Sequence, residues 1–122
     1  DKTNCMLMAA IPGRVGDGES KTLSYGDKQV TTLMGKPQTP ATFKRFLVGP
    51  KGAEITGITE TPDGRALFVN IQHPGENTKM ADIADPAKYE SQWPANIGYG
   101  TGKRPRSATI VITKNDGGVI GS

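Results

Sequence analysis

Short apolar runs separated by turn residues recur along this chain of 122 residues. Runs of this length, bounded by Gly, Pro, Asp or Asn, are typical of β-strands. The pattern predicts strands at residues 5–11, 42–48, 55–59, 66–72 and 107–114. No stretch shows the longer periodicity of an amphipathic helix, so we expect an all-β fold.

The third and fourth runs are joined by the sequence Thr61-Pro62-Asp63-Gly64, which has the chemistry of a tight turn. Pro62 presets φ, Asp63 accepts hydrogen bonds from nearby backbone, and Gly64 tolerates a left-handed exit. The two runs therefore form a predicted hairpin. We interpret Asp63 as a structural residue of the turn rather than a catalytic carboxylate.

The run at 66–72 carries apolar residues on both faces, with Leu67, Val69 and Ile71 on one and Ala66 and Phe68 on the other. Strands of this kind pack between neighbouring sheets, as in the blades of a β-propeller. Asn70 and Gln72 interrupt the second face. We favour a role for them in bonding the backbone of adjacent strands, and the alternative is that they reach solvent near a cavity.

The order of the runs predicts a partial β-propeller of antiparallel strands, roughly one and a half blades. The first two strands would end one blade and the next three would begin another, with Val119 and Ile120 as a remnant of a closing strand. We interpret the chain as a single piece, residues 1–122, from a larger propeller domain.

Two long stretches, 12–40 and 77–104, lack strand periodicity and are predicted to be irregular loops. In the second, Asp85 followed by Pro86 predicts a short helix, with Asp85 as its cap. We expect four side chains to anchor this loop: Met80, Tyr89, Trp93 and Tyr99. Loops of this length form either an active-site rim or mobile flaps.

The composition is poor in core-forming residues, since 34% of the chain is hydrophobic while it contains 16 Gly and 9 Pro. A small chain with so thin a core is better suited to be part of something larger or one partner of an oligomer. Strand edges without their blade neighbours seek partners. We therefore expect the remainder of a parent propeller as a partner, and self-association of the isolated chain.

The formal net charge of +3 and the pI of about 9.1 are mildly basic. This would favour an anionic substrate such as a phosphate ester, but a merely solvated surface is the favoured explanation for so small an excess. One compact basic cluster is present, at Lys103, Arg104 and Arg106. Since no basic stripe alternates with aromatic residues and no apolar run is long enough to span a membrane, we predict neither a nucleic-acid partner nor a membrane span.

Two kinds of site, a phosphate-binding loop and a serine hydrolase centre, lack the residues or spacing that they need. The glycines of residues 98–103 stand too close together for a phosphate-binding loop, and Arg104 occupies the position of the magnesium-binding hydroxyl. A single histidine and no nucleophile elbow argue against a serine hydrolase. The single cysteine, Cys5, excludes an internal disulfide, and its apolar surroundings predict a buried, inert thiol.

Glu54 is the candidate metal ligand. It directly precedes the strand beginning at Ile55 and follows the turn-forming residues 49–52. At the mouth of an innermost propeller strand, carboxylates from successive blades converge and can share calcium or oxygen-bridged iron. The alternative is a surface glutamate paired with Lys51.

His73 ends the second hairpin strand and is followed by Pro74 and Gly75, which turn the chain. A neutral imidazole there could bind metal or phosphate. We favour a structural hydrogen-bonding role because no second histidine is present to chelate with it. For Glu76 the default is a solvated side chain.

Several distinctive segments occur together in this chain: GAEITG at 52–57, TPDGRALFVNIQHPGE at 61–76, Trp93-Pro94, PRSATIVIT at 105–113 and the following Gly-Gly tail. In combination they resemble the C-terminal part of PhoX-type alkaline phosphatases. Glu60 departs from the family pattern, which has an apolar or aromatic residue there, and 12–40 is longer and more polar than that pattern. The family's cysteine ligand lies elsewhere in the longer chain and is not transferred to Cys5.

The resemblance implies the C-terminal portion of an exported phosphoric monoester hydrolase, periplasmic or secreted, with calcium and iron as its metals. It favours Glu54 as a ligand without assigning it to either metal, and the chain alone is expected to be inactive. The alternatives are a non-catalytic propeller module for binding or scaffolding and, with less support, a small basic β-protein acting alone.

Overall fold

The computed structural model describes residues 3–11, 17–95 and 103–122. These residues form seven strands and two short 3-10 helices, and no α-helix occurs in the described part of the chain. The strands are β1 (Met6–Ala10), β2 (Asp17–Tyr25), β3 (Lys28–Gly35), β4 (Phe43–Val48), β5 (Glu54–Glu60), β6 (Ala66–Gln72) and β7 (Ala108–Thr113). The predicted all-β class is confirmed.

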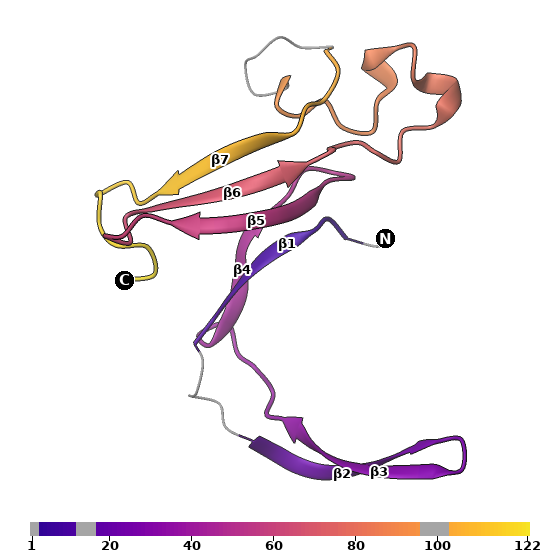
Figure 1. Cartoon of the computed structure of the whole chain (residues 1–122), viewed down its shortest axis with the longest axis vertical. Helices are drawn as coiled ribbons and strands as arrows, with labels where there is room; N and C mark the ends of the chain where they lie inside the picture. The colour runs from indigo at the N-terminus through magenta and orange to yellow at the C-terminus, as the bar shows by residue number, and fades with distance from the viewer. Residues whose placement is uncertain (1–2, 12–16, 96–102) are drawn as a thin grey trace. The chain divides into compact units, whose positions relative to one another are not determined.

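The strands form three small sheets, β1–β4, β2–β3 and β5–β6–β7 (Figure 1). β1 and β4 are antiparallel, since Gly49 N–H donates to the Cys5 carbonyl at one end and Ile11 N–H to the Thr42 carbonyl at the other. All five predicted strands are present, with bounds within one residue of the prediction. Two strands of one sheet followed by three of the next agree with a partial propeller.

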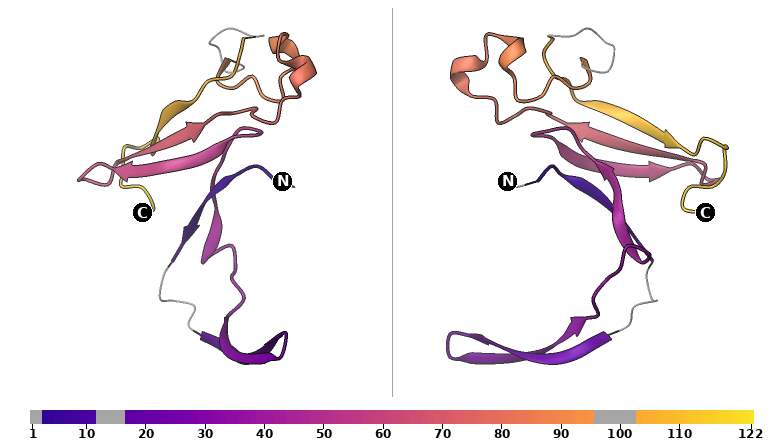
Figure 2. Two further views of the ribbon diagram at one scale, coloured as in Figure 1. Left: turned by 45° about the vertical axis from the view of Figure 1, so that its right-hand side comes forward. Right: turned by 180° about the vertical axis from the view of Figure 1, so that it is seen from behind.

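The chain divides into two compact units, one of residues 1–7 and 47–122 and one of residues 8–46. The first contains the three-stranded sheet, whose strands lie side by side in order β5, β6, β7 (Figure 2). The second contains the β2–β3 hairpin. The candidate site lies in the first unit.

The core of the first unit centres on one face of β6. Val69 and Ile71 are 0% and 2% exposed. Their cross-strand neighbours are also apolar: Ile58 and Ile110 beside Val69, and Ile55 and Ala108 beside Ile71. Burial of such side chains, at roughly 25 cal/mol per Å² of apolar surface, stabilises the sheet.

The opposite face of β6 is less buried than predicted. Phe68 is half-buried, while Asn70 and Gln72 are exposed. The Asn70 Oδ1 accepts a hydrogen bond of 2.8 Å from the hydroxyl of Thr109, its neighbour on β7. The favoured backbone-bonding role of Asn70 is therefore wrong, because its side chain bonds another side chain at the surface.

The turn between β5 and β6 has the predicted chemistry. The Asp63 Oδ1 accepts hydrogen bonds from the Thr61 hydroxyl at 2.6 Å and from the Arg65 N–H at 3.2 Å. Gly64 adopts a φ of 67°. Asp63 is thus a structural residue, and the hydrogen bond from Thr61, followed by that from the Arg65 backbone, lowers the pKa of its carboxyl.

This lowered pKa predicts an acid-dependent contribution from the turn. A carboxyl whose folded-state pKa is below its unfolded value of about 3.9 stabilises the fold above that pH and loses the effect as pH falls through the lowered value. We expect Asp63→Asn to flatten the fall in melting temperature below about pH 4. Circular dichroism melts from acid to neutral pH would measure this, with Asp27→Asn in the β2–β3 turn as control. Identical acid limbs for the Asp63→Asn variant and the unmodified chain would contradict it.

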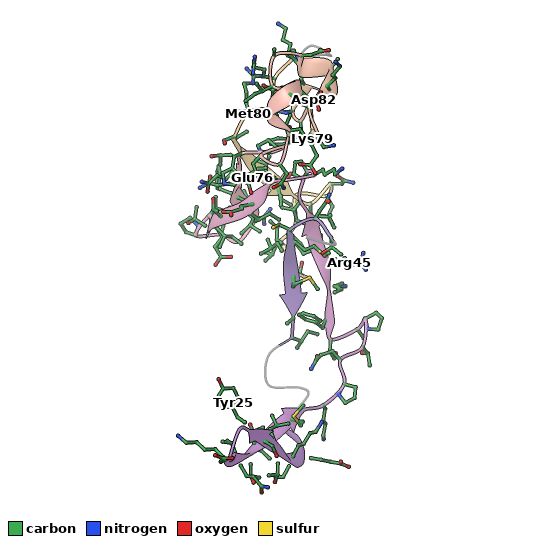
Figure 3. All side chains as sticks on the ribbon, turned by 90° about the vertical axis from the view of Figure 1, so that its right-hand side faces the viewer. Tyr25, Arg45, Glu76, Lys79, Met80 and Asp82 are labelled. Carbon is green, nitrogen blue, oxygen red and sulfur yellow. The ribbon has the colours of Figure 1, made fainter. Side chains whose placement is uncertain are left out.

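The prediction of an irregular loop at 12–40 is wrong for much of that stretch. β2 and β3 form an antiparallel hairpin in which Leu23 lies opposite Val30. The turn contains Gly26, with a φ of 57°, and Tyr25 projects from the hairpin (Figure 3). Both faces of β3 are exposed along its whole length, so the hairpin lacks the apolar alternation that marks a half-buried strand.

The stretch after β6 contains the two 3-10 helices, η1 (Met80–Asp82) and η2 (Pro86–Lys88). The Asp85 carboxylate accepts the Ala87 N–H at 3.1 Å, which confirms the predicted cap. Of the four expected anchors, the Tyr89 hydroxyl donates to the Ile83 carbonyl at 2.8 Å and Trp93 is half-buried. Met80 is 81% exposed, so its predicted anchoring role is wrong. Tyr99 lies outside the described residues.

Two further expectations are corrected. Cys5 is exposed rather than buried, because its position just before β1 leaves its side chain at a surface. Val119 and Ile120 do not form a strand. Instead, Ile120 N–H donates to the Gly64 carbonyl at 2.9 Å, so the C-terminal residues fold onto the β5–β6 turn.

Candidate functional site

Glu54 is the first residue of β5 and lies opposite Gln72, the last residue of β6. A bulge at Gly57 shifts the register by one residue, and without it Glu54 would face His73. The bulge requires glycine, since φ is +38° and a Cβ atom would lie 2.7 Å from the Asn70 amide nitrogen. The bulge therefore sets Glu54 opposite the last residue of β6, one residue before the chain turns at His73.

The imidazole of His73 lies between two carboxylates. Its Nε2 is 3.8 Å from the Oε2 of Glu54, and its Nδ1 is 2.8 Å from the Oε2 of Glu76. The second distance is short, but the buried Nδ1 makes no hydrogen bond. The sequence favoured a structural role for His73 and a solvated Glu76. The structure places His73 between Glu54 and Glu76, and the Glu76 side chain is about half exposed.

The backbone around His73 is tied to two other segments. His73 N–H donates to the Ser107 hydroxyl at 2.9 Å. Gly75 N–H donates to the Lys51 carbonyl at 2.9 Å, and Glu76 N–H donates to the Gly52 carbonyl at 3.3 Å. The turn at 73–76 is thereby held against the segment that leads into β5 and against the residue that precedes β7.

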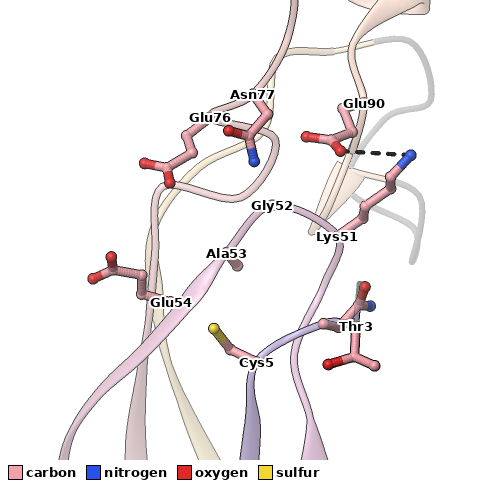
Figure 4. Close-up of a pocket in the computed structure, with 10 residues that line it drawn as sticks. Thr3, Cys5, Lys51, Gly52, Ala53, Glu54, Glu76, Asn77 and Glu90 are labelled. Carbon is pink, nitrogen blue, oxygen red and sulfur yellow. Dashed lines mark ion pairs between the residues drawn. The ribbon is translucent and has the colours of Figure 1, made fainter. Parts of the chain in front are cut away.

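The segment that leads into β5 and the end of the turn line a pocket of about 630 Å³, together with residues 3–5 and Glu90 (Figure 4). Its polar lining includes three carboxylates, two amides and one ammonium group: Glu54, Glu76, Glu90, Asn4, Asn77 and Lys51. Glu54 and Glu76 lie towards one side of it, and Glu90 and Lys51 towards the other. The exposed Cys5 also lines the pocket.

Lys51 pairs with Glu90, at 3.5 Å from Nζ to Oε1, rather than with Glu54 as the alternative for Glu54 proposed. The second carboxylate oxygen of Glu90 is buried and makes no hydrogen bond. This oxygen, Oε2, packs over Gly52, and a Cβ atom added at Gly52 would lie 2.6 Å from it. Glu90, which sequence reasoning missed, is therefore part of the pocket.

The donor set suits a hard cation, because carboxylate and amide oxygens are the ligands that calcium prefers. The Glu54 side chain is 54% exposed, so its oxygens are accessible to an ion. Among the residues that the structure describes, however, no three His, Cys, Asp or Glu side chains are grouped closely enough to hold a metal. The oxygen donors of the pocket are therefore of the type that calcium takes, but they are too few and too far apart to form a complete metal site within the described residues.

The basic cluster of Lys103, Arg104 and Arg106 does not belong to this pocket. The Arg104 guanidinium stacks on the Tyr89 ring at 5.3 Å and donates to the Tyr89 hydroxyl. Arg106 lines a separate pocket of about 370 Å³ beside Trp93 and Pro94. None of Lys103, Arg104 and Arg106 lines the pocket that contains Glu54. The rejected phosphate-loop motif falls mostly on residues 96–102, outside those described.

A family model described as alkaline phosphatase PhoX matches residues 5–75, which is more than half of the chain. The match includes Glu54 and His73 and extends over 12–40, where the sequence had appeared to depart from the family. Glu76, Trp93-Pro94 and 105–113 lie outside it. No curated protein and no solved structure matches the chain. Within the described residues, no helix has the length and apolar character needed to cross a membrane. The chain belongs to the alkaline phosphatase PhoX family.

Proposed function

We propose that this chain is part of an exported, metal-dependent phosphatase that hydrolyses phosphate monoesters, with calcium and iron at its metal centre. The observation that carries the proposal is the position of Glu54. It begins β5 within the segment matched by the family and opens into a pocket lined by further oxygen donors. Periplasmic or extracellular localisation is part of the proposal and rests on the family resemblance.

In this proposal the chain supplies ligands and charge rather than a nucleophile. Glu54 offers an anionic oxygen to a hard cation, with Glu76 in the same pocket. When bound, calcium and iron orient the ester and activate the oxygen nucleophile. Lys51 pairs with Glu90, and the three carboxylates leave the pocket with an excess of negative charge that suits a cation.

The remaining ligands belong to other blades of a longer protein, the parent phosphatase. Within the described residues no three ligands are grouped for a metal, and a shared multi-metal centre needs more than two. The chain alone is therefore proposed to be inactive.

The proposal is tested by assaying this chain and the parent phosphatase side by side with p-nitrophenyl phosphate. We expect no turnover by the chain alone, even with added calcium and iron. The parent phosphatase should lose its turnover on chelation and recover it when both metals are restored. Full turnover after exhaustive chelation would exclude metal dependence. A parent protein that binds no metal and has no turnover would instead support the alternative of a non-catalytic propeller module.

A further inference from the structure

His73 has an unusual backbone. It is the one non-glycine residue with a positive φ, 33°, in the part of the chain that the structure describes. Residues with a Cβ atom rarely adopt this conformation, whereas glycine adopts it freely. His73 does not itself line the pocket, but it contacts Glu54 and Glu76, which do. A strained residue that persists beside such carboxylates indicates that its side chain has a use there.

The surroundings hold this conformation from several directions. The hydroxyl of Ser107 accepts the His73 N–H, and the next residues are bound to the carbonyls of Lys51 and Gly52. Pro74 and Gly75 are buried. The Cα atom that carries the imidazole is therefore fixed relative to β5, although the imidazole itself is partly exposed.

The imidazole reaches two carboxylates that come from different segments. Glu54 belongs to β5, and Glu76 follows the turn after β6. The Glu54 Oε2 lies 3.8 Å from Nε2 on one side of the ring, so the imidazole occupies the space next to the Glu54 carboxylate. On the other side of the ring, the Glu76 Oε2 lies 2.8 Å from Nδ1.

We propose that His73 is a positioning residue that holds the Glu54 carboxylate in the direction needed for metal binding, and that Glu76 in turn fixes the imidazole. The inference rests on the proposed function, because it requires Glu54 to be a ligand. Groups that orient ligating carboxylates typically change metal affinity by about 10–100-fold when they are removed.

The test compares two variants of the parent phosphatase. His73→Gly removes the imidazole and relieves the strained φ, so we expect an unchanged or higher melting temperature together with a calcium affinity lowered about tenfold. His73→Gln keeps a side-chain N–H group that can reach one carboxylate and should recover part of that affinity. Calcium binding to the chelated protein, measured by titration calorimetry, gives a readout independent of turnover. Glu60→Gln, at the far end of β5, is the control.

Several results would overturn the inference. A calcium affinity of His73→Gly within about twofold of the parent value would leave His73 as a turn residue without a positioning role. A lowered melting temperature accompanying the loss of affinity, or no recovery in His73→Gln, would indicate a structural role instead. If Glu54→Gln also retained full calcium affinity, the proposed function itself would fail, whereas loss in Glu54→Gln but not in His73→Gly would reject the positioning role alone.

Discussion

Glu54→Gln in the parent phosphatase is expected to lower calcium and iron content and phosphatase turnover together, with turnover falling about 100-fold. The substitution keeps the size of the side chain and removes its charge, so a hard cation loses an anionic oxygen. Glu54 is half exposed and lies at the start of β5, so the sheet should still pack and stability should change by no more than about 0.5 kcal/mol. Elemental analysis and a monoester assay on the same preparation would measure both effects.

The control for this experiment is a glutamate that lies outside the pocket. Glu90 is distant from Glu54 in sequence, yet it lines the same pocket and is unsuitable. Glu60 ends the same strand, is exposed, and lies opposite Leu67. Glu60→Gln should leave metal content and turnover unchanged. A Glu54→Gln protein with its full metal complement and normal turnover would return Glu54 to the status of a surface carboxylate.

Gly52→Ala is expected to destabilise the chain strongly and to disturb the pocket. Gly52 has a φ of +62°, and a Cβ atom there would lie 2.6 Å from the Glu90 Oε2 and 3.2 Å from the backbone of Gly75. The left-handed conformation costs an alanine about 1–2 kcal/mol, and overpacking against backbone adds about 1–3 kcal/mol. Urea unfolding followed by circular dichroism would measure the loss.

Gly117→Ala is the matched control, because Gly117 has a φ of +69° and nothing within 4 Å of the added Cβ atom. The free energy of unfolding of Gly117→Ala should fall only by the cost of the left-handed conformation, about 1–2 kcal/mol. The difference between the two variants then reports the crowding of position 52 by the Glu90 carboxylate and by the backbone of Gly75. Equal losses would mean that these contacts do not restrict position 52.

Local chemistry explains which strands were predictable. β6 matches its predicted bounds, 66–72, because its apolar residues are continuous and turn residues precede it. The turn at Asp63 was predictable for the same reason, since its hydrogen bonds join residues at most five apart. The β2–β3 hairpin was missed because both faces of β3 are exposed, and a strand that buries neither face carries no apolar period.

The sequence by itself determined the all-β class, the β5–β6 hairpin and the choice of Glu54 as the leading carboxylate, since each depends on residues close together in the chain. Only the tertiary structure decided what surrounds Glu54. The bulge at Gly57 sets its register, the Ser107 hydroxyl holds the strained His73 backbone, and Glu90 reaches the pocket from a distant loop. These are contacts between segments far apart in sequence, and a single sequence contains no local pattern that reports which of its loops will meet.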